Sequence, residues 1–274
     1  MLRETARAGT SVPARATTSA GGCALNLAAG LAALGQSVAH TGIRGRDAAG
    51  RTVADALRHH AVTDLALVRD DLSTGRYAAI IEPDGGLALA AAAMDAYAHA
   101  AELERHAPFR EAASRADALV LDANGPPGAV RALARCRGPS TRLVLLATSA
   151  PKAPAIVPLM DEVDLLFSNA DEWGQLATRW SRPPALAFVT RGPEGAAAFR
   201  DGSEVAARSA HGARVADVIG AGDAFAAGAL AAWLDGAPDA DALDRGLATA
   251  ARCIARPGPL GWLEPSLEPS VETA

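Results

Sequence analysis

The sequence predicts an α/β protein whose central sheet is mostly parallel and is covered by helices on both faces. Short, continuous apolar runs alternate with helical stretches through the second half of the chain. Strands of a parallel sheet are buried on both faces and therefore read as unbroken apolar runs. The chain has 274 residues, of which 50% are hydrophobic and 21% charged, so it can bury a sizeable core in one large α/β domain or two small ones.

The first elements follow the order helix, strand, helix. Residues 23–34 are apolar on every face and rich in Ala and Leu, which predicts a buried helix that Gly35 ends. Residues 37–43 are predicted to form a strand and residues 48–59 a second helix.

Two hairpins are predicted outside the parallel part of the sheet. Two apolar runs flank Asp84-Gly85-Gly86, which indicates a β-hairpin over residues 73–91 as an insertion. Residues 192–195 (GPEG) begin a later hairpin, expected at the edge of the sheet.

The remaining elements form the main sheet and its helices. The predicted strands are residues 118–122, 143–147, 164–168 and 185–190. The predicted helices lie near residues 127–136, 171–178, 222–234 and 240–254. The tail after residue 254 is rich in Pro, Ser and Glu and is expected to be irregular.

Composition excludes several function classes. The 26 Lys and Arg against 31 Asp and Glu give a net charge of −5, which disfavours binding to a nucleic acid polymer. No run approaches the ~18 apolar residues of a membrane span, and the opening residues have no apolar core of a secretory signal, so a cytoplasmic protein is expected. The three cysteines are far apart and are expected to be reduced, and the six histidines show no metal-ligand spacing.

The most informative stretch is residues 217–228 (DVIGAGDAFAAG), in which a Gly-Ala-Gly turn leads into a helix that begins near Asp223. The unpaired N–H groups and partial positive charge of a helix start bind anions, and small residues allow close approach. A carboxylate on that turn is stabilised when charged and can accept a proton from a hydroxyl. The local pattern leaves open that Asp223 is only an N-cap. The spacing is not that of a dinucleotide-binding GxGxxG turn, and no P-loop motif occurs.

Five motifs in order resemble the ribokinase-like (PfkB) carbohydrate and nucleoside kinases, over about residues 12–262. They are GGCALN at 21–26, GRDAAG at 45–50, NADE at 169–172, TRGPEG at 190–195 and DVIGAGD at 217–223. The resemblance implies a ribokinase-like three-layer αβα sandwich with a small β lid. It also implies an ATP-dependent kinase that transfers the γ-phosphate to a hydroxyl group.

The resemblance assigns roles position by position. Asp223 would be the catalytic base, with the backbone of Gly220, Ala221 and Gly222 as the anion hole. The substrate-binding residues would be Gly21, Gly22 and Asn26, and the nucleotide-binding residues Asn169, Glu172, Thr190, Gly192 and Gly195. Asn169 and Glu172 would act on Mg²⁺ through water, and Asp217 would lie near a K⁺ loop, although Val218 and Ile219 replace its usual hydroxyl residues. Asn169 and Glu172 also fit a capping box, and Asp47 is expected to organise its turn.

Further segments are similar to pseudouridine kinases: residues 10–13 (TSVP), 74–77 (TGRY) and 121–124 (LDAN). This implies that Thr74 and Tyr77 approach the substrate from a lid and that Asn124, at the carboxyl end of a strand, meets the base edge. Tyr77 is equally compatible with an ordinary strand position. The predicted substrate is a ribosyl compound phosphorylated on its primary hydroxyl, with pseudouridine first and a ribose-like sugar as the alternative. A homodimer through the lid is also expected.

The sequence departs from the family pattern at its N-terminus. Members begin with an apolar strand that ends in an Asp, but residues 1–9 contain no apolar run. The expectation is therefore one domain over residues 1–274 that lacks the first central strand, with lid segments at about 8–20 and 73–92 and a nucleotide-binding half at about 164–262. Two interpretations stay open: a start codon assigned too late, or a shortened paralogue that binds a nucleoside without turnover.

Overall fold

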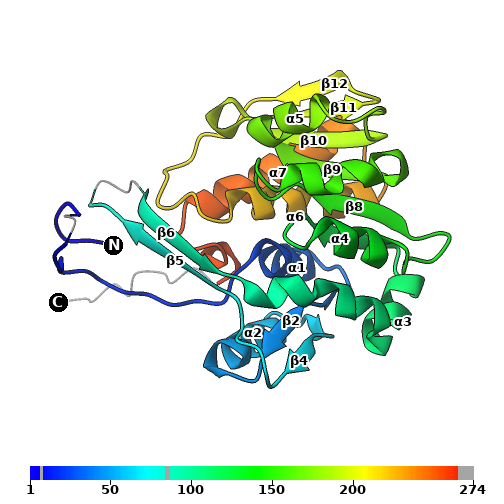
Figure 1. The fold of residues 1–274 in the computed structure, drawn as a ribbon. Helices are drawn as coiled ribbons and strands as arrows, with labels where there is room; N and C mark the ends of the chain where they lie inside the picture. The colour runs from blue at the N-terminus through cyan, green and yellow to red at the C-terminus, as the bar shows by residue number, and fades with distance from the viewer. Residues whose placement is uncertain (7–8, 84–86, 265–274) are drawn as a thin grey trace, which may run out of the picture.

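The main sheet of the protein has six strands in the order β12-β11-β10-β9-β8-β7 (Figure 1). The computed structural model describes residues 1–6, 9–83 and 87–264. Its parallel strands are β7 (Ala118–Asp122), β8 (Arg142–Leu146), β9 (Leu165–Asn169) and β10 (Leu186–Thr190). The hairpin β11 (Ala196–Arg200) and β12 (Ser203–Arg208) continues the sheet antiparallel, as predicted. All four parallel strands lie within two residues of their predicted positions.

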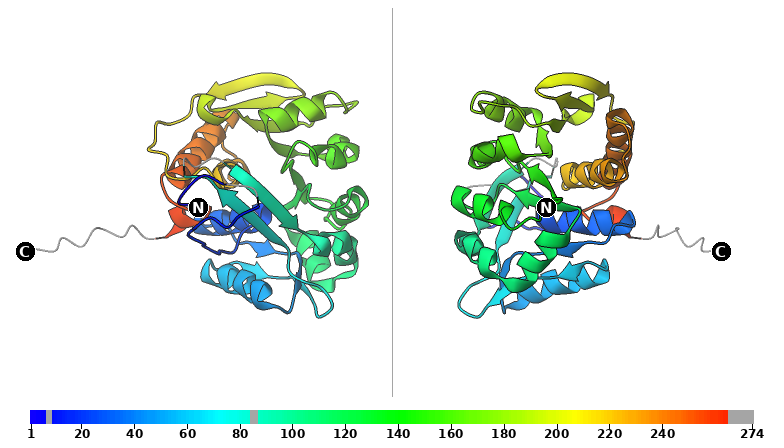
Figure 2. Two further views of the ribbon diagram at one scale, coloured as in Figure 1. Left: turned by 60° about the vertical axis from the view of Figure 1, so that its left-hand side comes forward. Right: turned by 90° about the vertical axis from the view of Figure 1, so that its right-hand side faces the viewer.

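Helices cover both faces of this sheet and make a three-layer sandwich (Figure 2). Along β8, Leu143 and Leu145 pack into one core while Val144 and Leu146 pack into the other. The second core is closed by α1 (Cys23–Ala33), α6 (Ala221–Leu234) and α7 (Asp239–Ile254). On the first face lie α3 (Ala107–Arg115), α4 (Pro127–Ala134) and α5 (Ala170–Ala177), together with the 3₁₀ segments η1 (Asp95–Arg105) and η2 (Ala153–Glu162). The predicted ribokinase-like fold class is confirmed.

The N-terminal part forms two small parallel pairs instead of one longer strand. The prediction of a single strand over residues 37–43 was wrong, because β1 (Ala39–His40) and β2 (Ile43–Gly45) are separated by Thr41 and Gly42. The Thr41 hydroxyl donates to the carbonyl of Leu65 at 3.1 Å at this break. The strands β1 and β2 pair with β3 (Thr63–Asp64) and β4 (Leu67–Arg69), while α2 (Ala48–His59) has the predicted bounds.

A gap separates these pairs from the main sheet. Among the described residues, β7 pairs only with β8, and β1 and β2 pair only with β3 and β4. Residues 40–44 and 120–122 line the same cavity of about 200 Å³. The cavity therefore lies between two open strand edges, which agrees with the predicted absence of a central strand.

The insertion forms a hairpin outside the main sheet, made of β5 (Arg76–Ile81) and β6 (Leu87–Ala93) (Figure 1). Its predicted turn at residues 84–86 lies outside the described residues. The N-terminal segment lies beside it, because Leu2 N donates to the carbonyl of Ile81 at 2.8 Å. Residues 1–3 in turn bond to residues 13–15, since Arg3 N donates to the carbonyl of Pro13 at 3.0 Å and Arg15 N to that of Met1 at 2.9 Å.

Several elements were not predicted. They are η1, η2, α3, β3, β4, the turn η3 (Gly192–Glu194) and η4 (Gly261–Leu263). The tail expected to be irregular forms η4, because Trp262 is buried against Ala224 and Cys253. Within the described part of the chain, no helix is long and apolar enough to cross a membrane.

Candidate active site

The GAGD turn starts α6 as the sequence predicts, with the helix beginning at Ala221. Gly220 is the N-cap and has a φ of +82°, a conformation that L side chains rarely adopt. A Cβ at Gly220 would also lie 2.6 Å from the Cβ of Pro259, so both the backbone conformation and the close neighbour require glycine at this position. The turn places Asp223 in the first turn of α6, where a carboxylate is favoured by the helix dipole.

Asp223 is held by a residue from the other end of the chain. Nδ2 of Asn26, on α1, donates to Oδ2 of Asp223 at 2.7 Å. The contact follows from the packing of α1 against α6. Leu27 and Leu31 of α1 share a core with Phe225 and Leu230 of α6. The two motifs that are farthest apart in the sequence therefore build one polar pair.

The environment raises the pKa of Asp223 to about 6. Burial is the main cause, and hydrogen bonds from Asn26 and Cys23 oppose it, while the charge of Asp122 adds to the rise. The thiol of Cys23 is affected in turn, because burial and then the charge of Asp223 raise its pKa to about 12. Asp223 is thus a carboxyl group that can exchange a proton near neutral pH.

Asn26 has an unused acceptor. Its side chain is buried, with 7% of the residue exposed, and its Oδ1 is a buried polar atom without a hydrogen-bond partner among the described residues. A buried amide oxygen without a partner costs free energy, on the order of 1–3 kcal/mol. A ligand hydroxyl that donates to Oδ1 would remove that cost.

The cavity beside this pair contains several of the predicted substrate residues. Gly21, Gly22, Thr74 and Asn124 line it. Asn26 and Asp223 are not among the lining residues; they are connected to the cavity through Cys23, which lines it and whose thiol is hydrogen-bonded to Asp223. Tyr77, in contrast, is on β5 with 62% of its surface exposed and is not among the lining residues.

Thr74 connects the hairpin to the body of the protein. Its hydroxyl donates to Oδ1 of Asp47 at 2.7 Å and accepts from Gly45 N at 3.0 Å. Asp47 also caps α2 by accepting from Gly50 N at 2.7 Å, so it organises its turn as expected. The hydrogen bonds from Thr74 and then Gly50 lower the pKa of Asp47 to about 2.

Most of the lining residues were not singled out as site residues from the sequence. Among them are Asp122, Tyr97 and Cys23, whose side chains are ionisable. Asp122 is at the carboxyl end of β7, where its Oδ1 accepts from Asn124 N at 2.9 Å. Its place at the end of an apolar run was an available signal, whereas Tyr97 comes from the unpredicted η1.

Asn124 has a further partner that the sequence did not suggest. Lys152 Nζ donates to Oδ1 of Asn124 at 2.6 Å. The lysine precedes η2 and lies 28 residues away, so only the fold brings a cation to this strand end.

The residues predicted to bind nucleotide lie at the ends of β9 and β10. Asn169 and Glu172 form the capping box of α5: Asn169 Oδ1 accepts from Glu172 N at 2.8 Å, and Glu172 Oε2 accepts from Asn169 N at 2.9 Å. Burial raises the pKa of Glu172. Thr190 ends β10, Gly192 begins the turn η3 and Gly195 follows it.

Asp217 holds the loop before the GAGD turn. Its Oδ1 accepts from Ile219 N and its Oδ2 from Gly258 N, both at 2.9 Å. Both carboxylate oxygens therefore bind backbone, and Val218 and Ile219 are exposed.

The chemistry of this arrangement is that of group transfer to an alcohol. A carboxyl group with a pKa of about 6 lies in the first turn of α6, where helix N–H groups can bind an anion, and its hydrogen-bond partner Cys23 lines a cavity of about 200 Å³. Fold and site together define a phosphotransferase that acts on a hydroxyl group.

Comparison with known proteins identifies the family. The model of the pfkB family carbohydrate kinases matches residues 3–264, and the chain belongs to this family. A carbohydrate kinase from Agrobacterium tumefaciens is 33% identical, with a TM-score of 0.77 over 92% of this chain and 84% of that one. No curated protein matches the sequence.

Two further solved structures share the fold at lower identity. A nucleoside kinase from Methanocaldococcus jannaschii is 17% identical, with a TM-score of 0.79 over 94% of this chain and 88% of that one. A ribokinase from Cryptococcus neoformans in complex with ADP is 20% identical, with a TM-score of 0.73 over 95% of this chain and 91% of that one.

Proposed function

We propose that this kinase uses ATP to phosphorylate the primary hydroxyl of a ribosyl compound, with pseudouridine as the first candidate. The observation that carries the proposal is the buried pair of Asn26 and Asp223 beside the cavity. The pair supplies a proton acceptor, Asp223, and a free amide acceptor for a neighbouring hydroxyl, Asn26 Oδ1. A polyhydroxylated sugar ring has hydroxyls for both.

In the proposed reaction, Asp223 takes the proton of the substrate hydroxyl as its oxygen attacks the γ-phosphorus. The bond from that phosphorus to the β–γ bridging oxygen breaks, ADP leaves, and the proton stays on the carboxyl group. Charge on the moving phosphoryl group would be stabilised by the backbone of Gly220, Ala221 and Gly222 and by the start of α6. One N–H of this turn, that of Ala221, donates to the carbonyl of Val218 at 3.2 Å in the structure.

The nucleotide would lie over the ends of β9 and β10, in the proposed half at about residues 164–262. Mg²⁺, when bound, neutralises charge on the phosphates. Asn169 and Glu172 fit a water-mediated contact better than direct ligation, because the capping box uses one oxygen of each side chain and Glu172 is 5% exposed. Asp217 is proposed to lie near a K⁺ site on the basis of its position alone, because both of its carboxylate oxygens already accept hydrogen bonds from backbone N–H groups.

The base of a nucleoside would bind near Asn124. Asn124 lines the cavity, and its carboxamide is oriented by the hydrogen bond from Lys152. The hairpin and the N-terminal segment are proposed as the lid, with Thr74 at its hinge and Tyr77 reaching the substrate on closure. Exposed apolar residues on the hairpin, among them Ile80 and Leu89, support a homodimer through this lid.

A substrate panel tests the proposal. Purified full-length protein is incubated with ATP and Mg²⁺ and with pseudouridine, uridine, adenosine, ribose or fructose, and ADP release is measured against the Asp223→Asn variant. We expect the highest kcat/KM with pseudouridine. Turnover with ribose alone would support the sugar kinase alternative. Binding of a nucleoside in a thermal-shift assay without ADP release from any compound would support a binding protein without turnover.

A further inference from the structure

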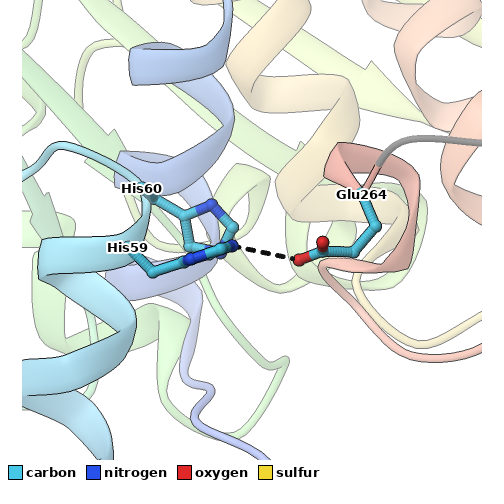
Figure 3. A group of neighbouring side chains, drawn as sticks. All are labelled: His59, His60 and Glu264. Atoms are coloured by element: carbon cyan, nitrogen blue, oxygen red, sulfur yellow. Dashed lines mark ion pairs between the residues drawn. The ribbon is translucent and has the colours of Figure 1, made fainter.

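Two histidines and a glutamate from distant parts of the chain meet at the C-terminal end of α2. His59 ends α2, His60 follows as its C-cap, and Glu264 directly follows η4. The sequence showed no ligand spacing for the histidines because the third member is 204 residues from His60. Figure 3 shows both imidazole rings and the carboxylate directed toward one another.

The spacing of these groups is close to that of metal ligands. One ligand atom from each residue can be chosen so that all three lie within 4.8 Å of one another, and His59 Nε2 is 3.4 Å from Glu264 Oε1. In a tetrahedral zinc site, bonds of about 2.0–2.2 Å to nitrogen and oxygen place neighbouring ligands about 3.4 Å apart. One pair already has this separation, and a ring nitrogen of His60 lies within 4.8 Å of both other ligand atoms.

We propose that His59, His60 and Glu264 form a binding site for one divalent transition-metal ion of the Zn²⁺ class. Two imidazoles and one carboxylate are the donor set that such ions favour over Mg²⁺ or Ca²⁺, which prefer oxygen ligands. The site is separate from the proposed catalytic centre and does not depend on the substrate.

Access to the site is open. The side chains of His59 and Glu264 are 65% and 52% exposed, so an ion can enter from solvent. A cavity of about 240 Å³, lined by His60 and Glu264 among others, leaves room for a water molecule as the fourth ligand. The site has one open position, as in three-ligand protein zinc sites.

The ion would fasten the segment that supports the anion-binding turn. Residues 257–261 line the cavity beside the ligands, and within them Gly258 N donates to Asp217 Oδ2 at 2.9 Å. Pro259 lies against Gly220, and Leu260 packs with the core that contains Leu57 of α2. A metal bridge from α2 to Glu264 would therefore hold the C-terminal side of this segment and stabilise the position of the GAGD turn through Pro259.

The test uses untagged, full-length protein treated with chelator and then titrated with ZnCl₂ in the presence of millimolar Mg²⁺. Calorimetry is expected to give one Zn²⁺ per chain, and Zn²⁺ is expected to raise the Tm and to slow amide exchange in residues 256–264. Co²⁺ is expected to give visible absorption of a nitrogen- and oxygen-ligated site.

Variants decide whether these residues bind the ion. His59→Ala, His60→Ala and Glu264→Gln are each expected to weaken Zn²⁺ binding at least tenfold, and His211→Ala, at another exposed histidine, is expected to leave it unchanged. Equal Zn²⁺ affinity in all variants would overturn the proposal, because the ion would then bind elsewhere. Binding of wild-type protein only at millimolar Zn²⁺ would also overturn it and would leave the contact as a His–Glu ion pair only.

Discussion

Asn26 and Asp223 are 197 residues apart in the chain and share a hydrogen bond of 2.7 Å between Nδ2 and Oδ2. The bond orients the carboxylate and favours its charged form, while burial favours the neutral form. The balance leaves the carboxyl group with a pKa of about 6, which suits a base that works near neutral pH.

Replacing the proposed base should strongly slow turnover without unfolding the protein. Asp223→Asn keeps the shape of the side chain but cannot accept the proton, and kcat is expected to fall by roughly 10²–10⁴. Steady-state ADP release measures the change, with binding of nucleotide and nucleoside by calorimetry as the control. A kcat within threefold of wild type would rule out Asp223 as the base.

The raised pKa of Asp223 also predicts a change in stability with pH. The folded state retains a proton that the unfolded chain releases, so this contribution to stability is full below about pH 4 and is lost as pH rises through about 6. A rise of about two units corresponds to roughly 3 kcal/mol. Urea unfolding of Asp223→Asn is therefore expected to show a higher free energy of unfolding than wild type at pH 7 and a smaller difference at pH 4. Parallel profiles for the two proteins would show that the pKa of Asp223 is not raised in the folded protein.

Removing the side-chain amide of Asn26 should raise the pKa of Asp223. Asn26→Leu removes the donor to Asp223, so the pKa of the carboxyl group is expected to rise further and the acid limb of the kcat profile to move to higher pH. The lost charged hydrogen bond is worth about 1.5–3 kcal/mol, or about a 10- to 100-fold loss of kcat/KM. Asn26→Asp is a second variant, expected to be more damaging because it places two carboxylates together. An unchanged acid limb in Asn26→Leu would exclude this coupling.

The hydroxyl of Thr74 should matter for stability as well as for the site. Thr74→Val removes a buried hydroxyl that bonds Asp47 and Gly45, with an expected cost of about 1–3 kcal/mol in chemical unfolding. Thr52→Val is the matched control, because that exposed hydroxyl bonds only the carbonyl of Ala48 within its own helix. Equal, small effects of the two variants would show that the Thr74 network is not needed.

The anion-binding turn should not tolerate a side chain at its first glycine. Gly220→Ala forces a residue with a Cβ into a φ of +82° and against Pro259, at a cost of about 1–3 kcal/mol. Gly174→Ala, where a Cβ meets no atom within 4 Å, is the control and is expected to be neutral or slightly stabilising. Thermal unfolding of both variants measures the difference, and a neutral Gly220→Ala would contradict the strained turn.

The sequence by itself determined the local order of the molecule. The apolar runs predicted the bounds of β7 correctly and those of the other parallel strands to within two residues, because a strand buried on both faces must be apolar throughout. The GAGD pattern located the start of α6, because glycine at a positive φ followed by small residues is a local requirement. Motif order was sufficient to predict the family.

Only the tertiary structure decided which side chains meet. The pairing of Asn26 with Asp223, the contact of Lys152 with Asn124 and the cluster of His59, His60 and Glu264 depend on which distant segments the fold places side by side. Propensity and hydrophobic spacing act over one or two turns of chain, whereas these contacts join residues 28 to 205 positions apart. The pKa of Asp223 likewise comes from burial in the folded molecule, which no local pattern encodes.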